Sequence, residues 1–213
     1  MVFNFHHRTG NTVLLSKELT FKAPTWDNIE SITVELYKLV RNDGYSPDII
    51  AGISRGGLVP ARIISDLFLC EFEKPTLAIM QIGFYSGVGK TEKEPIIYQD
   101  LPGHIHGKKI LLIDDVADSG VSLDFAMKYL NMKKPLEVRI GTLYYKPWSK
   151  VKPQYYVEET ESWIIFPHER YEFMTEQLKN RKMDVTEAKE FFLKEAGIPK
   201  YSIEQFIKII KTK

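Results

Sequence analysis

The segment Ile110-Leu-Leu-Ile-Asp-Asp-Val-Ala-Asp-Ser-Gly-Val-Ser122 holds the residues best suited to chemistry. Its apolar start predicts a strand that brings Asp114 and Asp115 to its carboxyl end, and Asp118 opens the next turn. Ligands of open α/β sheets bind at the carboxyl ends of strands. The turn 118–122 precedes a predicted helix, whose free N–H groups favour a phosphate. The whole run suits a sugar phosphate, although any one acid alone could simply cap a helix.

A second candidate is the loop Ser54-Arg55-Gly56-Gly57, which follows the apolar run 48–53. The two glycines allow the backbone to approach an anion closely. The Arg55 guanidinium can donate two parallel hydrogen bonds to phosphate oxygens. Taken alone, a tight turn before a helix explains the loop equally well.

Two weaker candidates follow. The segment 83–97 is long, polar and rich in glycine, which is typical either of a functional loop or of a plain surface loop. The segment Lys146-Pro147-Trp148 follows a predicted strand and, with Trp163, offers an ammonium donor and a ring that can stack on a heterocycle. On the residues alone, a solvated Lys146 and a core Trp163 are the better explanation.

The elements around these segments alternate between strands and helices. We expect residues 1–24 to form a short strand and a loop. The first long helix is predicted at 26–41. Strands are predicted at 48–53, 76–82, 110–113 and 138–145, with helices at 58–69 and 123–130 and short strands at 155–157 and 163–166. This order predicts an α/β fold with a mostly parallel sheet flanked by helices.

Beyond Pro167 the sequence becomes helical. Three segments are predicted: 168–180, a second that starts at Asp184 and stops at Gly197, and a third that runs from Ser202 to the end. Glu187 and Gln205 stand three residues after the capping residues of the last two, as in a capping box. We therefore expect residues 1–167 to form the α/β core with a base-binding segment, and 168–213 to form a C-terminal three-helix subdomain.

Composition sets broad limits. The chain has 213 residues, a hydrophobic content of 44% and a formal net charge of +1. These values suit a globular enzyme and argue against nucleic acid or a membrane surface as a partner. Cys70 is the single cysteine, which excludes an intrachain disulfide, and we expect it to be a small core residue. Since no apolar run approaches about 18 residues, we expect a cytoplasmic protein.

The acidic segment resembles the PRPP-binding signature of the type I phosphoribosyltransferases. The phrase Gly52-Ile-Ser-Arg-Gly-Gly-Leu-Val-Pro60 is similar to the pyrophosphate loop of the xanthine–guanine type. The resemblance covers residues 26–167. It implies the type I fold and a Mg²⁺-dependent transfer in which PRPP and a purine base give a nucleoside 5′-monophosphate and pyrophosphate. We also expect a homodimer.

The resemblance also implies residue roles. Asp114 and Asp115 would contact the ribose hydroxyls and the magnesium–PRPP complex, and Asp118 would handle a proton near N7 of the base. The loop for the 5′-phosphate would consist of Asp118, Ser119, Gly120, Val121 and Ser122. Pyrophosphate would bind to Ser54, Arg55, Gly56 and Gly57.

Base recognition and closure are implied in the same way. Lys146 would contact O6 of the base, Trp163 would stack on the ring, and Ile164 would supply backbone contacts. A loop at 83–94, with Tyr85 and Ser86 as its contacts, would close over PRPP.

The sequence gives conflicting indications of the base. Lys146 is a donor and suits the O6 acceptor of hypoxanthine or guanine. The tail, however, resembles an extension found in some archaeal members, including adenine-using ones. His168 also follows Pro167 where a tryptophan is more typical of the 6-oxopurine type. Weighing the tail above the lysine, we expect adenine, with a 6-oxopurine as the alternative.

Two other functions stay open at this stage. The chain could be a PRPP-sensing regulator on the same fold, and a pyrophosphate-release assay separates that regulator from an enzyme. The tail could be a partner-binding module.

The pyrophosphate loop yields a first prediction. Arg55→Ala should weaken binding of PRPP and pyrophosphate more than binding of the nucleotide product, because Arg55 is expected to contact only the leaving group. Calorimetric titration with each ligand measures this difference. Equal losses for pyrophosphate and nucleotide would contradict the loop assignment.

Overall fold

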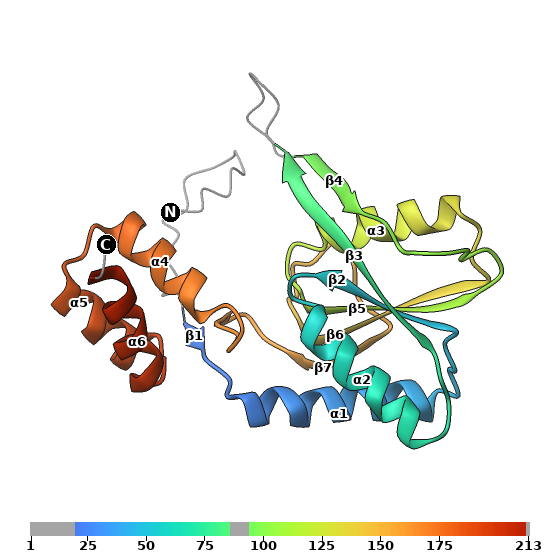
Figure 1. Ribbon diagram of the computed structural model, residues 1–213, viewed down its shortest axis with the longest axis horizontal. Coiled ribbons are helices and arrows are strands. Elements are labelled where there is room, and N and C mark those ends of the chain that lie inside the picture. The colour runs from blue at the N-terminus through green and yellow to red at the C-terminus, as the bar shows by residue number, and fades with distance from the viewer. Residues whose placement is uncertain (1–19, 86–93, 212–213) are drawn as a thin grey trace, which may run out of the picture. The chain divides into compact units, whose positions relative to one another are not determined.

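The computed structural model describes residues 20–85 and 94–211. Contacts divide them into two units. One spans Asp27–Glu161, and the other joins the described residues up to Trp26 to those from Ser162 onward (Figure 1).

The unit Asp27–Glu161 is built on a six-stranded sheet of order β4-β3-β2-β5-β6-β7. The four strands β2, β3, β5 and β6 and the edge strand β7 run parallel, and β4 alone is antiparallel. Their bounds are β2 (Ile49–Ser54), β3 (Thr76–Tyr85), β4 (Glu94–Gln99), β5 (Lys109–Ala117), β6 (Glu137–Tyr145) and β7 (Tyr155–Glu159). The predicted α/β fold with a mostly parallel sheet is confirmed.

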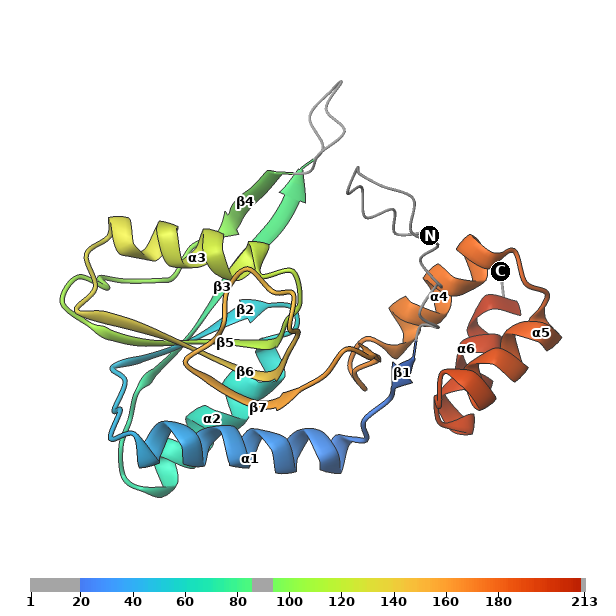
Figure 2. The same cartoon turned by 180° about the vertical axis from the view of Figure 1, so that it is seen from behind.

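Helices cover both faces of this sheet. The helices α1 (Trp26–Asn42) and α2 (Leu58–Cys70) lie on one face, and α3 (Val121–Met132) lies on the other (Figure 2). The rings of Tyr37 and Phe68 join α1 to α2 with centroids 5.0 Å apart. The central strands are apolar on both sides because both sides are covered.

The glycine-rich segment differs from its prediction. Where we expected a loop across 83–97, β3 and β4 extend as an antiparallel hairpin that pairs Tyr85 with Glu94 and Gly83 with Ile96. Ile96 and Ile97 favour a strand, and the polar residues around them hid that signal. Residues 86–93, which include Ser86, lie outside the described residues.

The second unit combines two short strands with the helical tail. The strands β1 (Phe21–Lys22) and β8 (Trp163–Ile164) pair in parallel. After β8 the chain forms α4 (Arg170–Arg181), α5 (Val185–Glu190), the π-helical turn η1 (Phe191–Glu195) and α6 (Lys200–Lys211). The ring of Phe21 lies 5.7 Å from those of both Phe173 and Phe191, so an N-terminal residue completes the core of the tail.

This grouping differs from the boundary that we expected at residue 167. Ile165 is fully buried in the same apolar cluster as the tail helices, and β8 pairs with β1. The segment 162–167 thus groups with β1 and with the tail. The division into residues 1–167 and 168–213 stays a prediction.

Local details of the helices test other expectations. The capping box of Asp184 and Glu187 is confirmed, with both reciprocal hydrogen bonds formed. The last helix begins at Lys200, directly after Pro199, and not at Ser202 as expected. The core position expected for Cys70 is wrong: it ends α2 and is exposed, since the buried face of that helix runs through Ile64 and Phe68.

The membrane criterion can be stated for the same part of the chain. Across residues 20–85 and 94–211, no helix combines the length and the apolar character that crossing a membrane requires.

The capping box yields a stability prediction. Asp184 accepts hydrogen bonds from the backbone N–H groups of Thr186 at 2.6 Å and Glu187 at 2.9 Å. Asp184→Ala removes this acceptor and should lower the free energy of unfolding by about 1 kcal/mol. Urea denaturation followed by circular dichroism measures the loss. Asp184→Asn keeps an acceptor and is the control, so equal stability of the two variants would contradict the role of the cap.

Candidate active site

Three neighbouring parallel strands place the predicted site residues at one edge of the sheet. β5 lies between β2 and β6, with Gly52 paired to Ile113 and Ala117 paired to Tyr145. The loop 54–57, the acids of β5, the turn 118–122 and Lys146 all occur at the carboxyl ends of these strands. This is the edge where an open α/β sheet binds its ligands.

The loop 54–57 lies directly against the acidic strand. The Ser54–Arg55 peptide is cis, and Gly57 N–H donates to the Ile53 carbonyl oxygen at 2.8 Å. A side chain on Gly56 would collide with the Asp115 carboxylate, and one on Gly57 would collide with the carbonyl oxygen of Ile113. Glycine at both positions therefore lets the loop lie this close to β5 with the Asp115 carboxylate in its place.

Asp114 and Asp115 belong to β5 itself and not to the turn after it. Asp115 is only 7% exposed, and its backbone N–H donates to Asp114 Oδ1 at 3.0 Å. Burial and the neighbouring Asp115 carboxylate raise the pKa of Asp114 well above its ordinary value, although hydrogen bonds from the backbone of Asp115 and Gly57 oppose the shift. The pair thus favours a cation nearby.

The same pair suits Mg²⁺. Among the residues that the structure describes, no group of three or more acids, histidines or cysteines is arranged to hold a metal. Mg²⁺ is commonly bound by one or two carboxylates together with substrate phosphates. Two adjacent acids beside a candidate phosphate turn meet that requirement.

The turn 118–122 has the geometry of an anion site. Gly120 precedes α3 with φ of 75°, a left-handed conformation that favours glycine. The helix then begins at Val121, so the first N–H groups of α3 open toward the turn. These groups and the helix dipole favour a phosphate.

Lys146 follows β6 and is 4% exposed. Burial lowers the pKa of its ammonium below the ordinary value, and the negative charge of Asp118 opposes this shift. Its backbone N–H donates to the Ala117 carbonyl oxygen at 3.0 Å, which ties the end of β6 to the start of the turn 118–122. A buried ammonium therefore lies near the acid predicted to handle a proton.

We did not predict a role for Trp148, although its segment stood out with Lys146. Its indole Nε1–H donates to Asp118 Oδ1 at 3.2 Å, and its ring centroid lies 5.5 Å from Lys146 Nζ. A tryptophan two residues after a candidate base-contacting lysine was the available signal, but the contact with Asp118 depends on folding.

Comparison with known proteins decides the family. The model of the phosphoribosyl transferase domain matches residues 25–171. The chain belongs to this family. The xanthine-guanine phosphoribosyltransferase of Gluconobacter oxydans is 30% identical over 150 residues, covering 69% of this chain and 83% of the relative. The hypoxanthine phosphoribosyltransferase of Haemophilus influenzae is 29% identical over 123 residues, covering 55% of this chain and 62% of the relative.

Solved structures agree. The purine phosphoribosyltransferase of Pyrococcus horikoshii has a TM-score of 0.62 at 31% identity, covering 70% of this chain and 94% of that one. A protein of Neisseria gonorrhoeae with bound ppGpp has a TM-score of 0.60 at 25% identity, covering 70% of this chain and 90% of that one. The type I fold and the purine branch of the phosphoribosyltransferases, both expected from the sequence, are confirmed.

The remaining predicted residues are placed separately. Tyr85 ends β3. Trp163 and Ile164 form β8 in the other unit, where Trp163 is 37% exposed and Ile164 is buried. Their parts in closing the site and in binding the base stay predictions.

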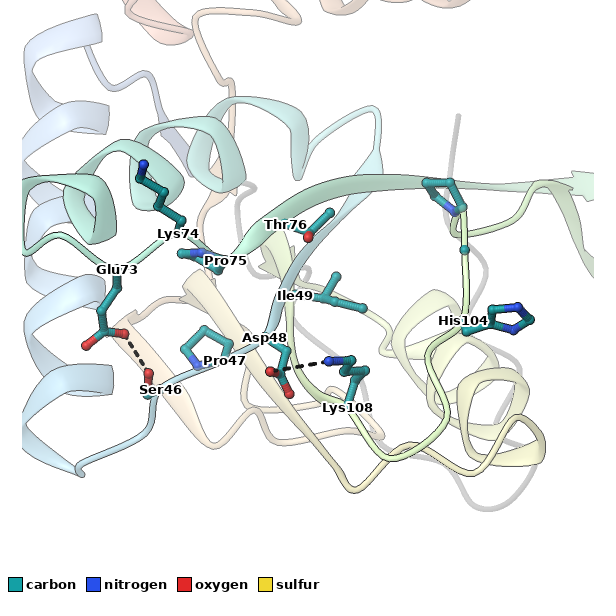
Figure 3. A pocket seen from close by; sticks show the side chains of 12 residues that line it. Ser46, Pro47, Asp48, Ile49, Glu73, Lys74, Pro75, Thr76, His104 and Lys108 are labelled. Atoms are coloured by element: carbon teal, nitrogen blue, oxygen red, sulfur yellow. Dashed lines mark hydrogen bonds and ion pairs between the residues drawn. The ribbon is translucent and has the colours of Figure 1, made fainter.

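A pocket of about 590 Å³ lies at the opposite end of the strands in this phosphoribosyltransferase (Figure 3). Its lining includes Ile49 and Thr76, the first residues of β2 and β3, together with Asp48, His104 and Lys108. None of the predicted site residues lines it. The acids and the phosphate turn therefore identify the candidate site better than this cavity does.

The packing of the glycine loop yields a prediction. Gly56→Ala should displace the Asp115 carboxylate and weaken PRPP binding by about tenfold or more, because a carboxylate expected to contact the ligand must move. Titration of PRPP, followed by calorimetry, measures the loss.

Gly57→Ala is the matched comparison. Its methyl group would meet main-chain atoms of Ile113 and Ile53, which cannot rotate away, so the variant should lose thermal stability without any ligand. Gly56→Ala should unfold near the wild-type temperature. The reverse pattern would contradict the role given to the Asp115 contact.

Proposed function

We propose that the chain transfers ribose 5-phosphate from PRPP to a 6-oxopurine, giving a nucleoside 5′-monophosphate and pyrophosphate. The observation that supports this choice is the buried ammonium of Lys146 at the end of β6. The ammonium is a donor and the 6-oxo group is an acceptor, whereas the 6-amino group of adenine is itself a donor.

The names of the relatives favour the same base. Relatives named xanthine-guanine and hypoxanthine phosphoribosyltransferase support a 6-oxopurine over the adenine that we expected from the sequence. The adenine preference depended on the helical tail, whereas the family match ends at residue 171. The base is therefore better inferred from Lys146 than from the tail.

In the proposed mechanism, each loop holds one part of PRPP. The turn 118–122 binds the 5′-phosphate, the loop 54–57 binds the pyrophosphate, and Asp114 and Asp115 hold the ribose hydroxyls and Mg²⁺. When bound, Mg²⁺ supplies positive charge to the leaving pyrophosphate. Alignment of the reactants alone can lower the barrier by about 7–11 kcal/mol.

The base completes the reaction. The bond from the anomeric carbon to pyrophosphate breaks as the bond to N9 forms, and Asp118 accepts the proton that the purine gives up. Lys146 donates to O6, Trp163 stacks on the ring, and Ile164 supplies backbone contacts. Tyr85 and Ser86 belong to the segment that closes over PRPP. We further propose that the working enzyme is a cytoplasmic homodimer.

One competition assay tests the base. Adenine, hypoxanthine, guanine and xanthine are mixed in equal amounts with PRPP and Mg²⁺, and nucleotides and pyrophosphate are followed by chromatography. One or more of the three 6-oxopurines should be consumed while adenine remains. Consumption of adenine first would overturn the proposal, and absence of any pyrophosphate would favour the regulator.

A variant ties the result to the lysine. Lys146→Met keeps the aliphatic stem and removes the donor, so kcat/KM for the preferred 6-oxopurine should fall by about 10- to 100-fold. The matched control is Lys128→Met, which removes an exposed lysine of α3 that pairs with Asp124.

A further inference from the structure

Trp148 contacts both groups that the proposed function assigns to proton transfer and base recognition. Its indole Nε1–H donates to Asp118 Oδ1 at 3.2 Å. The face of its ring lies 5.5 Å from Lys146 Nζ, within the range of a cation–π contact. One side chain thus connects the carboxylate to the ammonium.

The backbone on both sides of this contact is fixed. Lys146 N–H donates to the Ala117 carbonyl oxygen at 3.0 Å, and Lys150 N–H donates to the Ser119 carbonyl oxygen at 3.1 Å. These two hydrogen bonds bracket Asp118 on one segment and Trp148 on the other. Although the Trp148 side chain is 50% exposed, its backbone is therefore held at a set distance from Asp118.

The turn 146–151 also packs tightly against the turn 118–122. Ser149 N–H donates to the Lys146 carbonyl oxygen at 2.9 Å, and Ser149 Oγ–H donates to the Val151 carbonyl oxygen at 3.0 Å. An added Cβ on Gly120 would lie 2.6 Å from Ser149 Oγ and 2.7 Å from Val151 N. The two turns leave no room for a side chain between them, so they form one rigid support for Trp148.

We propose that Trp148 is a positioning residue for the transfer reaction. Its N–H holds Oδ1 of Asp118, which leaves Oδ2 directed to the proton of the purine. Its ring face holds the Lys146 ammonium on the side of the exocyclic oxygen. Trp148 makes no contact with the reacting atoms and acts only through Asp118 and Lys146. The proposal therefore rests on the proposed function, which gives those two residues their roles.

Two substitutions separate the two contacts. Trp148→Phe keeps a ring and removes the donor, so kcat should fall about tenfold while KM for PRPP stays within about twofold. Trp148→Leu also removes the ring, so KM for the purine should rise by a further two- to fivefold or so. A loss of binding for PRPP alone would overturn the proposal.

Trp26→Phe is the matched control. Trp26 is 52% exposed, close to the exposure of Trp148, and its ring lies 6.2 Å from that of His168. The same tryptophan-to-phenylalanine substitution is therefore made at a position of similar exposure. Its kcat and both KM values should remain those of the wild type. Thermal unfolding of every variant shows whether a loss of activity reflects a loss of fold.

A double-mutant cycle decides whether Trp148 acts through Asp118. Asp118→Ala alone should lower kcat by about 10²–10⁴. If Trp148 positions this carboxylate, Trp148→Phe has no further effect on kcat in the Asp118→Ala background. An equal loss in both backgrounds overturns the proposal. So does a rise in kcat/KM for Trp148→Phe alone, which would show that the indole competes with the base for Asp118.

The outcomes distinguish this proposal from the proposed function. If the wild-type enzyme releases no pyrophosphate with any 6-oxopurine, the proposed function fails. If it turns over a 6-oxopurine and Trp148→Phe matches it in kcat, only the role of Trp148 fails.

Discussion

Asp114 and Asp115 bring two adjacent carboxylates to the carboxyl end of β5, and the repulsion between them is the constraint around which the candidate site is arranged. Burial and the charge of Asp115 together raise the pKa of Asp114. Hydrogen bonds from the backbone of Asp115 and Gly57 to Asp114 oppose this shift of the pKa. Gly56, which has no side chain, leaves space for the Asp115 carboxylate. The glycine loop thus serves the acids as well as any bound anion.

The parallel sheet extends this arrangement to three loops. Because β5 lies between β2 and β6, the loops after all three strands meet at one edge. The loops after β5 and β6 are further joined by backbone hydrogen bonds between residues 117 and 146 and between 119 and 150. The turn proposed to bind the phosphate and the turn proposed to contact the base are therefore held together by the protein itself, which reduces the entropy that binding must overcome.

Local signals made much of this predictable. The strands at Ile49–Ser54 and Lys109–Ala117 are apolar on both faces, and short turns of glycine and hydroxyl residues follow them. Both patterns involve only consecutive residues, so they can be recognised from the sequence. Features that depend on distant contacts were missed: β4, whose isoleucines pair with β3; the place of Phe21 among the tail aromatics; and the exposure of Cys70. The contact of Trp148 with Asp118 belongs to the same class, since it joins residues 30 positions apart.

The choice of base turns on the same distinction between local pattern and fold. From the sequence, we gave the tail more weight than Lys146 because such a tail is uncommon. In the structure, the buried aromatic residues of the tail pack with one another and with Phe21. Their presence is therefore explained by the hydrophobic core of that unit and does not indicate a substrate. Lys146 is also buried: burial lowers the pKa of its ammonium below the ordinary value, and the negative charge of Asp118 opposes this shift. Its ammonium can donate to a ligand oxygen, whereas an amino group of a ligand would be a second donor. Together with the names of the relatives, this donor supports our proposal of an exocyclic oxygen over an amino group.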